Sequence, residues 1–252
     1  MLDLRLINAE ILKLRRRRGM LAIALVSTLG FAVLVFIVTG IQHAGDPAKY
    51  EPAGGIKTYR DALGTMEMLV LIMGTIVGAT AGTQDIESGV FRDLAATGRS
   101  RMALFGARVT GAMAVTIPIA AITALVVGAA SIGLAGGTPT PDASDLLGGT
   151  GLALGGAAVA TAAGVGASAL VGSRGPVIGL LLGFFLAIQP LLETMPFLGS
   201  ARNVMPSAAL DGIGDLSRYG LNVSAGMGAA VLATWIAVAL GAGAWRTKTR
   251  EI

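Results

Sequence analysis

The side chains best placed to do chemistry are the charged ones in Thr83–Arg108, TQDIESGVFRDLAATGRSRMALFGAR. This stretch lies between two long apolar runs, and one unpaired charge at the centre of a bilayer costs about 2.5–3.5 kcal/mol. We therefore expect it to be an aqueous loop. Within it, Ile86, Val90 and Leu94 recur at four-residue spacing, which predicts a short helix with one apolar face. Such a helix is suited to docking into a groove of another protein.

Two residues can set the ends of this predicted helix. Gly98 can end it, and Ser100 can cap the next helix along the chain. The alternative is an ordinary solvated loop helix without a partner. These two interpretations concern residues 84–101.

Glu67 is the only ionisable residue that lies clearly within an apolar run, in LGTMEMLV. An acid at this depth favours a functional role, such as a place in a substrate pathway. Its predicted closeness to the outer surface equally favours a snorkelling or locally paired carboxylate. The chain has no cysteine, a single histidine, and no Ser-His, Asp-Asp or His-Glu constellation within its apolar runs. We therefore expect no catalytic site and no metal site, and hence no enzyme.

The composition describes an integral membrane protein. Hydrophobic residues make up 54% of the 252 residues, charged residues only 13%, and the mean hydropathy is +0.74. About 20 apolar residues are needed to cross the hydrocarbon of a bilayer as a helix. We predict an all-α protein with six transmembrane helices in one transmembrane domain, residues 1–252. The predicted spans are about 20–41, 63–82, 110–133, 147–172, 177–192 and 225–245.

Residues 1–18 predict an amphipathic helix at the membrane interface. Its apolar residues recur every three or four positions, at Leu4, Ile7, Ile11 and Leu14. The helix is either a simple basic anchor or also a contact for a cytosolic partner. Fourteen of the 19 Lys and Arg residues fall in segments that a cytosolic N-terminus and six spans place inside. Both termini and residues 84–101 are therefore expected in the cytosol.

Three other stretches carry structural expectations. Glycines and prolines make Gln42–Ala62 an expected irregular loop. The fourth span is nearly all Gly and Ala, with Gly151/Gly155 and Ala160/Gly164 at the spacing that lets helices approach closely. Prolines at 190, 196 and 206 break the chain before the last span into short apolar pieces. For residues 193–224 we expect a partly re-entrant cap on the outer face.

These features resemble the permease subunits of ABC exporters of the second type. In that family the segment after the second span runs acid, Gly-Thr, a basic residue, Leu, a small residue or Pro, Ser-Arg, and then Lys. The matching residues here are Glu87, Gly89, Arg92, Leu94, Ser100, Arg101 and Arg108. The chain departs from the family pattern with Val90 for Thr, Gly98 for Pro and Arg108 for Lys.

The resemblance implies a role and a set of partners. The role is to pass the closure of an ATPase to the spans, through an interface formed by Ile86, Glu87, Gly89, Val90, Arg92, Leu94 and Arg101. The partners would be a cytosolic ABC ATPase dimer, a second permease in a homodimer or heterodimer, and the bilayer of the cell membrane, with no nucleic acid. The chain has no G-x-x-x-x-G-K-[ST] loop, so ATP and Mg are expected on the partner ATPase.

The substrate class is inferred from what the chain lacks. Sugar-chain exporters need an aromatic-lined channel, whereas this chain is only 5% aromatic. We expect a hydrophobic or amphipathic small molecule, such as a drug, an antibiotic or a lipid, and Glu67 would favour a cationic one. Two alternatives stay open. One is an ion-coupled secondary transporter, a class usually marked by several ionisable residues within the spans, of which only Glu67 is present here. The other is a non-transporting subunit that recruits an ATPase.

Overall fold

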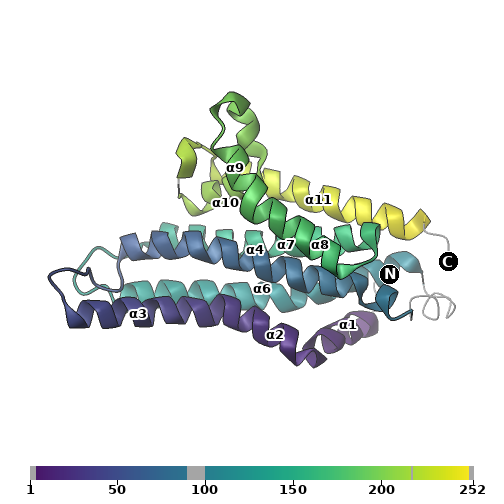
Figure 1. Ribbon diagram of the computed structural model, residues 1–252, viewed down its shortest axis with the longest axis horizontal. Coiled ribbons are helices and arrows are strands. Elements are labelled where there is room, and N and C mark those ends of the chain that lie inside the picture. Colours follow the sequence, from purple (N-terminus) through teal and green to yellow (C-terminus); the bar gives the residue numbers. More distant parts are fainter. Residues whose placement is uncertain (1–3, 90–99, 217, 250–252) are drawn as a thin grey trace.

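The computed structural model describes residues 4–89, 100–216 and 218–249. These residues are largely helical and include no strand, and the long helices run side by side in an elongated bundle (Figure 1). Six helical segments are long and apolar enough to cross a membrane. The prediction of an all-α protein with six spans is therefore confirmed. Both ends of the chain lie at the end of the bundle where α4 ends and α6 begins (Figure 1).

The spans differ in how they are built. Three are single helices that form the centre of the bundle, namely α4 (Ile56–Glu87), α6 (Arg101–Gly133) and α7 (Ala143–Val171). The first span joins α2 (Arg18–Leu25), the π-helical turn η1 (Val26–Gly30) and α3 (Phe31–Gly45). The fifth joins α8 (Arg174–Gly183), the π-helical turn η2 (Phe184–Ile188) and α9 (Gln189–Glu193). The sixth is α11 (Ala225–Thr249), and α1 (Leu4–Arg16) precedes the first span.

The irregular loop expected over Gln42–Ala62 is shorter than predicted. Helix α3 continues to Gly45 and α4 begins at Ile56, so the expectation is wrong at both ends. Buried packing overrides the polar sequence at the start of α4, because Tyr59 is only 2% exposed there. The turn before α4 is fixed by the end of α6. The amide of Gly54 donates to Leu134 O at 2.9 Å, and the amide of Gly55 donates to Ser131 O at 2.7 Å.

Helix α6 begins as the sequence indicates. Ser100 caps it, because its hydroxyl oxygen accepts a hydrogen bond from the Ala103 amide at 3.1 Å, which confirms the predicted cap. The helix has 33 residues, or about 50 Å at 1.5 Å per residue. It is therefore longer than the hydrocarbon layer of about 30 Å. Pro118 lies inside it without ending it.

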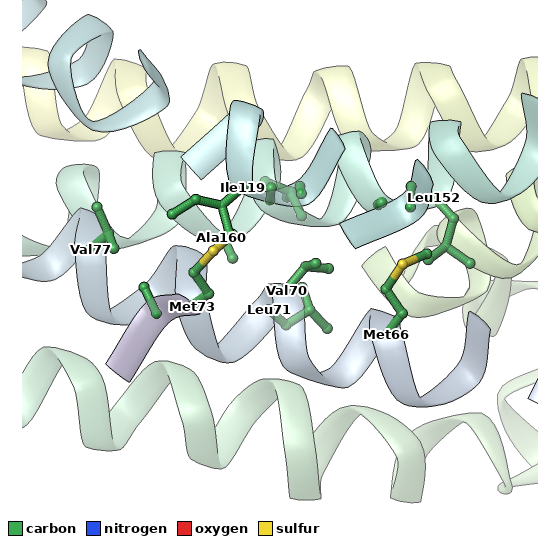
Figure 2. Close-up of a cluster of buried hydrophobic side chains, with 14 of the residues drawn as sticks. Met66, Val70, Leu71, Met73, Val77, Ile119, Leu152 and Ala160 are labelled. Atoms are coloured by element: carbon green, nitrogen blue, oxygen red, sulfur yellow. The ribbon is translucent and has the colours of Figure 1, made fainter. Parts of the chain in front are cut away.

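Small residues bring α4 and α7 into backbone contact. A Cβ added to Gly78 would lie 2.5 Å from Thr161 O, and one added to Gly164 would lie 2.7 Å from Ala79 N. The predicted close approach of the fourth span is thus confirmed at Gly164. Around this contact Figure 2 shows a cluster of buried apolar side chains, whose labelled members come from α4, α6 and α7. It contains Met66, Val70, Leu71, Met73 and Val77 of α4, Ile119 of α6, and Leu152 and Ala160 of α7.

The prolines of the fifth span and the segment after it act in two ways. Pro190 does not break the fifth span, because η2 precedes it and a π-helical turn accommodates the missing amide donor. Pro196 and Pro206 each begin a new short helix, the 3-10 helix η3 (Pro196–Val204) and α10 (Pro206–Gly214). Helix α10 is mostly buried and contacts α7 and α11. A short 3-10 turn, η4 (Arg218–Gly220), leads on toward α11.

Candidate functional site

Four charged side chains join α1, α4 and α6 where α4 ends. Lys13 Nζ lies 2.6 Å from Glu10 Oε1 and 3.0 Å from Asp85 Oδ1. Arg108 Nη2 lies 3.0 Å from Asp85 Oδ2, and the two side chains are only 3% and 6% exposed. We call Glu10, Lys13, Asp85 and Arg108 the inner ionic network.

The sequence around the network explains how α1 reaches it. Leu14 of α1 is 1% exposed and anchors the amphipathic helix against the bundle. Gly111 of α6 has no side chain, and a Cβ there would lie 2.7 Å from Glu10 Cβ. Helix α1 therefore packs closely on α6, while Leu4 and Leu12 stay exposed.

The energetics of the inner ionic network favour a fixed geometry. Removing charges from water costs several kcal/mol per ion unless each charge is paired and hydrogen-bonded. Asp85 meets this condition, because Lys13 donates to both of its carboxylate oxygens and Arg108 donates to one of them. Separating α4 from α6 would break the buried pair of Asp85 and Arg108, and moving α1 away would take Lys13 from Asp85. The three helices are thus held as one body at this end.

The residues of the predicted ATPase interface are not all on one helix. Ile86 and Glu87 lie in the last turn of α4, and Gly89 has a φ of +74° in a turn that follows. Helix α4 ends at Glu87, before Gly89. Val90, Arg92 and Leu94 lie outside the described residues. Arg101 is the first residue of α6.

Glu87 makes a contact that the sequence did not indicate. Its carboxylate accepts a hydrogen bond from the Arg174 backbone amide at 2.9 Å, and Arg174 Nε lies 3.8 Å from it. Arg174 is the first residue of α8, so the carboxylate lies at the positive end of that helix. The end of α4 is thus tied to the start of α8. The Glu87 side chain keeps 36% of its surface exposed, so a partner can still reach it.

Near the other end of α4, Glu67 is paired within the chain. Arg218 of η4 forms ion pairs with both Glu67 and Asp211 of α10, and its Nε lies 2.7 Å from Asp211 Oδ1. Glu67 is 4% exposed and Asp211 is also 4% exposed. The local pairing expected as one interpretation of Glu67 is therefore present. We call Glu67, Asp211 and Arg218 the outer ionic cluster.

The outer ionic cluster lines a cavity of about 180 Å³ between α4, the fifth span and α10. Glu193 also lines it and is 1% exposed; its carboxylate accepts hydrogen bonds from the Ser207 hydroxyl and from the Ala208 amide, the latter at 3.1 Å. Three carboxylates thus face one guanidinium among the charged residues that line this cavity. Such a wall attracts a positively charged group.

Sequence reasoning missed most of these partners for one reason. Asp211 and Arg218 were visible only as charges in a broken segment, and Asp85 as one of several loop charges. Their pairing depends on contacts between distant elements, since Arg218 lies 151 positions from Glu67 and Lys13 lies 72 positions from Asp85. The one local signal was the position of Asp85 and Arg108, each close to the inner end of an apolar run.

One comparison with known families gives a match. The family model described as ABC-2 family transporter protein matches residues 6–190. The matched range includes the whole inner ionic network and Glu67, and ends before Asp211 and Arg218. No curated protein matches the chain.

Proposed function

The chain belongs to the ABC-2 family of transporter proteins, and on that premise we propose that it is the permease subunit of an ATP-driven exporter in the cell membrane. The family supports a multi-pass membrane component that depends on an ABC ATPase for energy. In this proposal both termini and residues 84–101 face the cytosol. A separate ATPase dimer carries ATP and Mg, and a second permease, identical or related, completes the transporter.

The inner ionic network is the observation that carries the proposal. It joins α1, α4 and α6 next to the stretch that resembles the family's coupling segment, and Glu87 extends the connection to α8. A push from a docked ATPase at this point would move four helices together instead of deforming one loop. Rigid-body movement of packed helices is a common form of switching in proteins.

The proposed cargo is a hydrophobic or amphipathic small molecule that moves out of the cell. The bundle offers an acidic cavity at the outer ionic cluster, with Glu67 in its wall. Export through this region requires the Arg218 bridge between α4 and α10 to open and close. The cavity supports this proposal because α10, which contributes Ser207 and Asp211 to its wall, is tied to α4 through Arg218.

The test of the proposal is ATPase docking. Leu94→Asp would place a charge in the apolar contact, where each Å² of buried apolar surface contributes about 25 cal/mol. We expect this variant to lose the ATPase during co-purification, or to lose substrate-stimulated ATP hydrolysis in reconstituted vesicles. Ala95→Ser, one position along, is the matched control and should behave as the wild type.

Three outcomes would reject the proposal. A stably inserted Leu94→Asp protein that retains the ATPase and full stimulation would make the segment a solvated loop. Transport that runs on an ion gradient without ATP would place the protein among secondary transporters instead. A protein that binds the ATPase but moves no substrate would be a recruiting subunit.

A further inference from the structure

A second cavity lies on a different face of α4, between that helix, α3 and α6. Its volume is about 210 Å³. Aromatic and aliphatic side chains form most of its wall, among them Phe31 and Phe36 of α3 and Leu69 of α4. Neither the ATPase interface nor the outer ionic cluster uses this space. It is large enough for a ligand, because an apolar protein cavity of about 150 Å³ holds a benzene molecule.

Three of the five threonine hydroxyl groups in the wall can only accept hydrogen bonds from a ligand. Thr28, Thr39 and Thr123 each line the cavity. Each donates its hydroxyl hydrogen to a carbonyl of its own helix, at 2.7, 2.9 and 2.9 Å respectively. Their oxygen atoms therefore present lone pairs to the cavity. A ligand that satisfies them must bring donors.

Asp61 is an exposed residue that adds a negative charge to the same wall. Within the described residues its carboxylate has no hydrogen bond and no ion pair closer than 4 Å. The basic residues near it on α4 form their ion pairs with other carboxylates, although Lys57 also attracts Asp61 at longer range. Lys57 Nζ lies 2.8 Å from Glu51, and Arg60 Nη2 lies 3.6 Å from Asp145. A cation in the cavity would thus find a carboxylate without an ion-pair partner of its own.

We propose that this cavity binds a small lipophilic amine in its protonated form. The ammonium group lies toward Asp61, and the apolar body packs against Phe31, Phe36 and Leu69. A cation near an aromatic ring gains further attraction from the ring face. The volume fits one ring with a short aliphatic arm. This inference deepens the proposed function by naming a substrate class, although binding itself requires no ATPase.

The experiment compares two probes of nearly equal size, 3-phenylpropylamine and 3-phenylpropanol, on the purified full chain in lipid nanodiscs. Binding is measured by titration calorimetry at neutral pH, where the amine is charged and the alcohol is not. We expect the amine to bind more tightly. Asp61→Asn should weaken amine binding about five-fold, the effect of one partly exposed ion pair, and should leave the alcohol unchanged.

A second variant tests whether the two probes bind inside this cavity. Ala32 lines the wall and is 9% exposed, so Ala32→Leu would fill the space and should abolish binding of both probes. The inference would be overturned if the amine and the alcohol bound with equal affinity. It would also be overturned if neither Asp61→Asn nor Ala32→Leu changed the affinity for the amine. A wild-type chain that binds the amine but docks no ATPase would reject the proposed function and leave this site in place. The reverse result would reject the site alone.

Discussion

The inner ionic network makes a quantitative prediction about stability. Arg108→Met removes one partner of a buried pair and leaves the Asp85 carboxylate with Lys13 alone, 3.0 Å away. Breaking a buried ion pair in this way costs about 3–5 kcal/mol, and the remaining Lys13 contact puts the expected loss near the lower figure, about 3 kcal/mol. For a chain of this size that corresponds to a drop in melting temperature of about 6–12 °C.

Two further variants distinguish the cost of breaking the buried ion pair from the cost of removing any one charged side chain of the network. Lys13→Met leaves Asp85 paired with Arg108, but it also removes the partner of Glu10, which is 7% exposed. Because Lys13 itself is 30% exposed, the expected cost is about 1–2 kcal/mol, less than that of Arg108→Met. Asp85→Asn combined with Arg108→Met removes both charges of the buried pair. The double variant should lose less than the sum of the two single losses, by about 0.5–3 kcal/mol.

The assay heats samples of the purified protein to a series of temperatures. Size-exclusion chromatography then measures how much folded protein remains at each temperature. We expect the wild type to have the highest melting temperature, Lys13→Met a lower one and Arg108→Met the lowest. If Arg108→Met melts no lower than Lys13→Met, the buried pair does not hold these helices together. Strictly additive losses in the double variant would likewise show that Asp85 and Arg108 act independently, and the reasoning from their 3.0 Å contact would be wrong.

Two other predictions concern topology and packing. The chain has no cysteine, so an impermeant maleimide on intact cells should label Ser200→Cys and not Ser88→Cys; labelling of Ser88→Cys alone would reverse the proposed orientation. Gly164→Ala should destabilise the protein by about 1–3 kcal/mol, because its Cβ would lie 2.7 Å from a backbone nitrogen of α4. The control is Gly241→Ala in α11, where the added Cβ meets open space, so the melting temperature should stay the same or rise slightly. If both variants lowered the melting temperature equally, the α4–α7 contact would be looser than described.

The fold was predictable from the sequence because the free-energy cost of placing charged residues in hydrocarbon decides which segments can span the membrane. Charged residues are too costly in hydrocarbon to be placed freely, so the long apolar runs had to be the spans and the charged stretches their ends. The limits of the helices were less predictable. Tyr59 and its neighbours look like loop residues by polarity, yet α4 starts at Ile56 because Tyr59 is buried. Hydropathy does not register contacts of that kind.

The candidate site was predictable only where a residue is unusual for its position. Glu67 could be singled out because an acid in an apolar run is rare, but Arg218 could not be named as its partner. Their contact requires η4 and α10 to fold back toward α4, and no local pattern encodes that return. Glu87 shows the same limit. It was expected to face another protein, and within this chain it also holds the first amide of α8.

Helix α4 connects the two groups of buried charges. Glu67 and Asp85 lie 18 positions apart on it, which at 1.5 Å per residue is about 27 Å, close to the thickness of the hydrocarbon layer. The residues between them carry no charge, and Gly78 brings the helix into backbone contact with α7. A helix anchored by ion pairs at both ends and packed this tightly has little freedom to bend. Displacement of the inner ionic network should therefore shift the Glu67 end as well, and the Arg218 bridge is the contact that must yield.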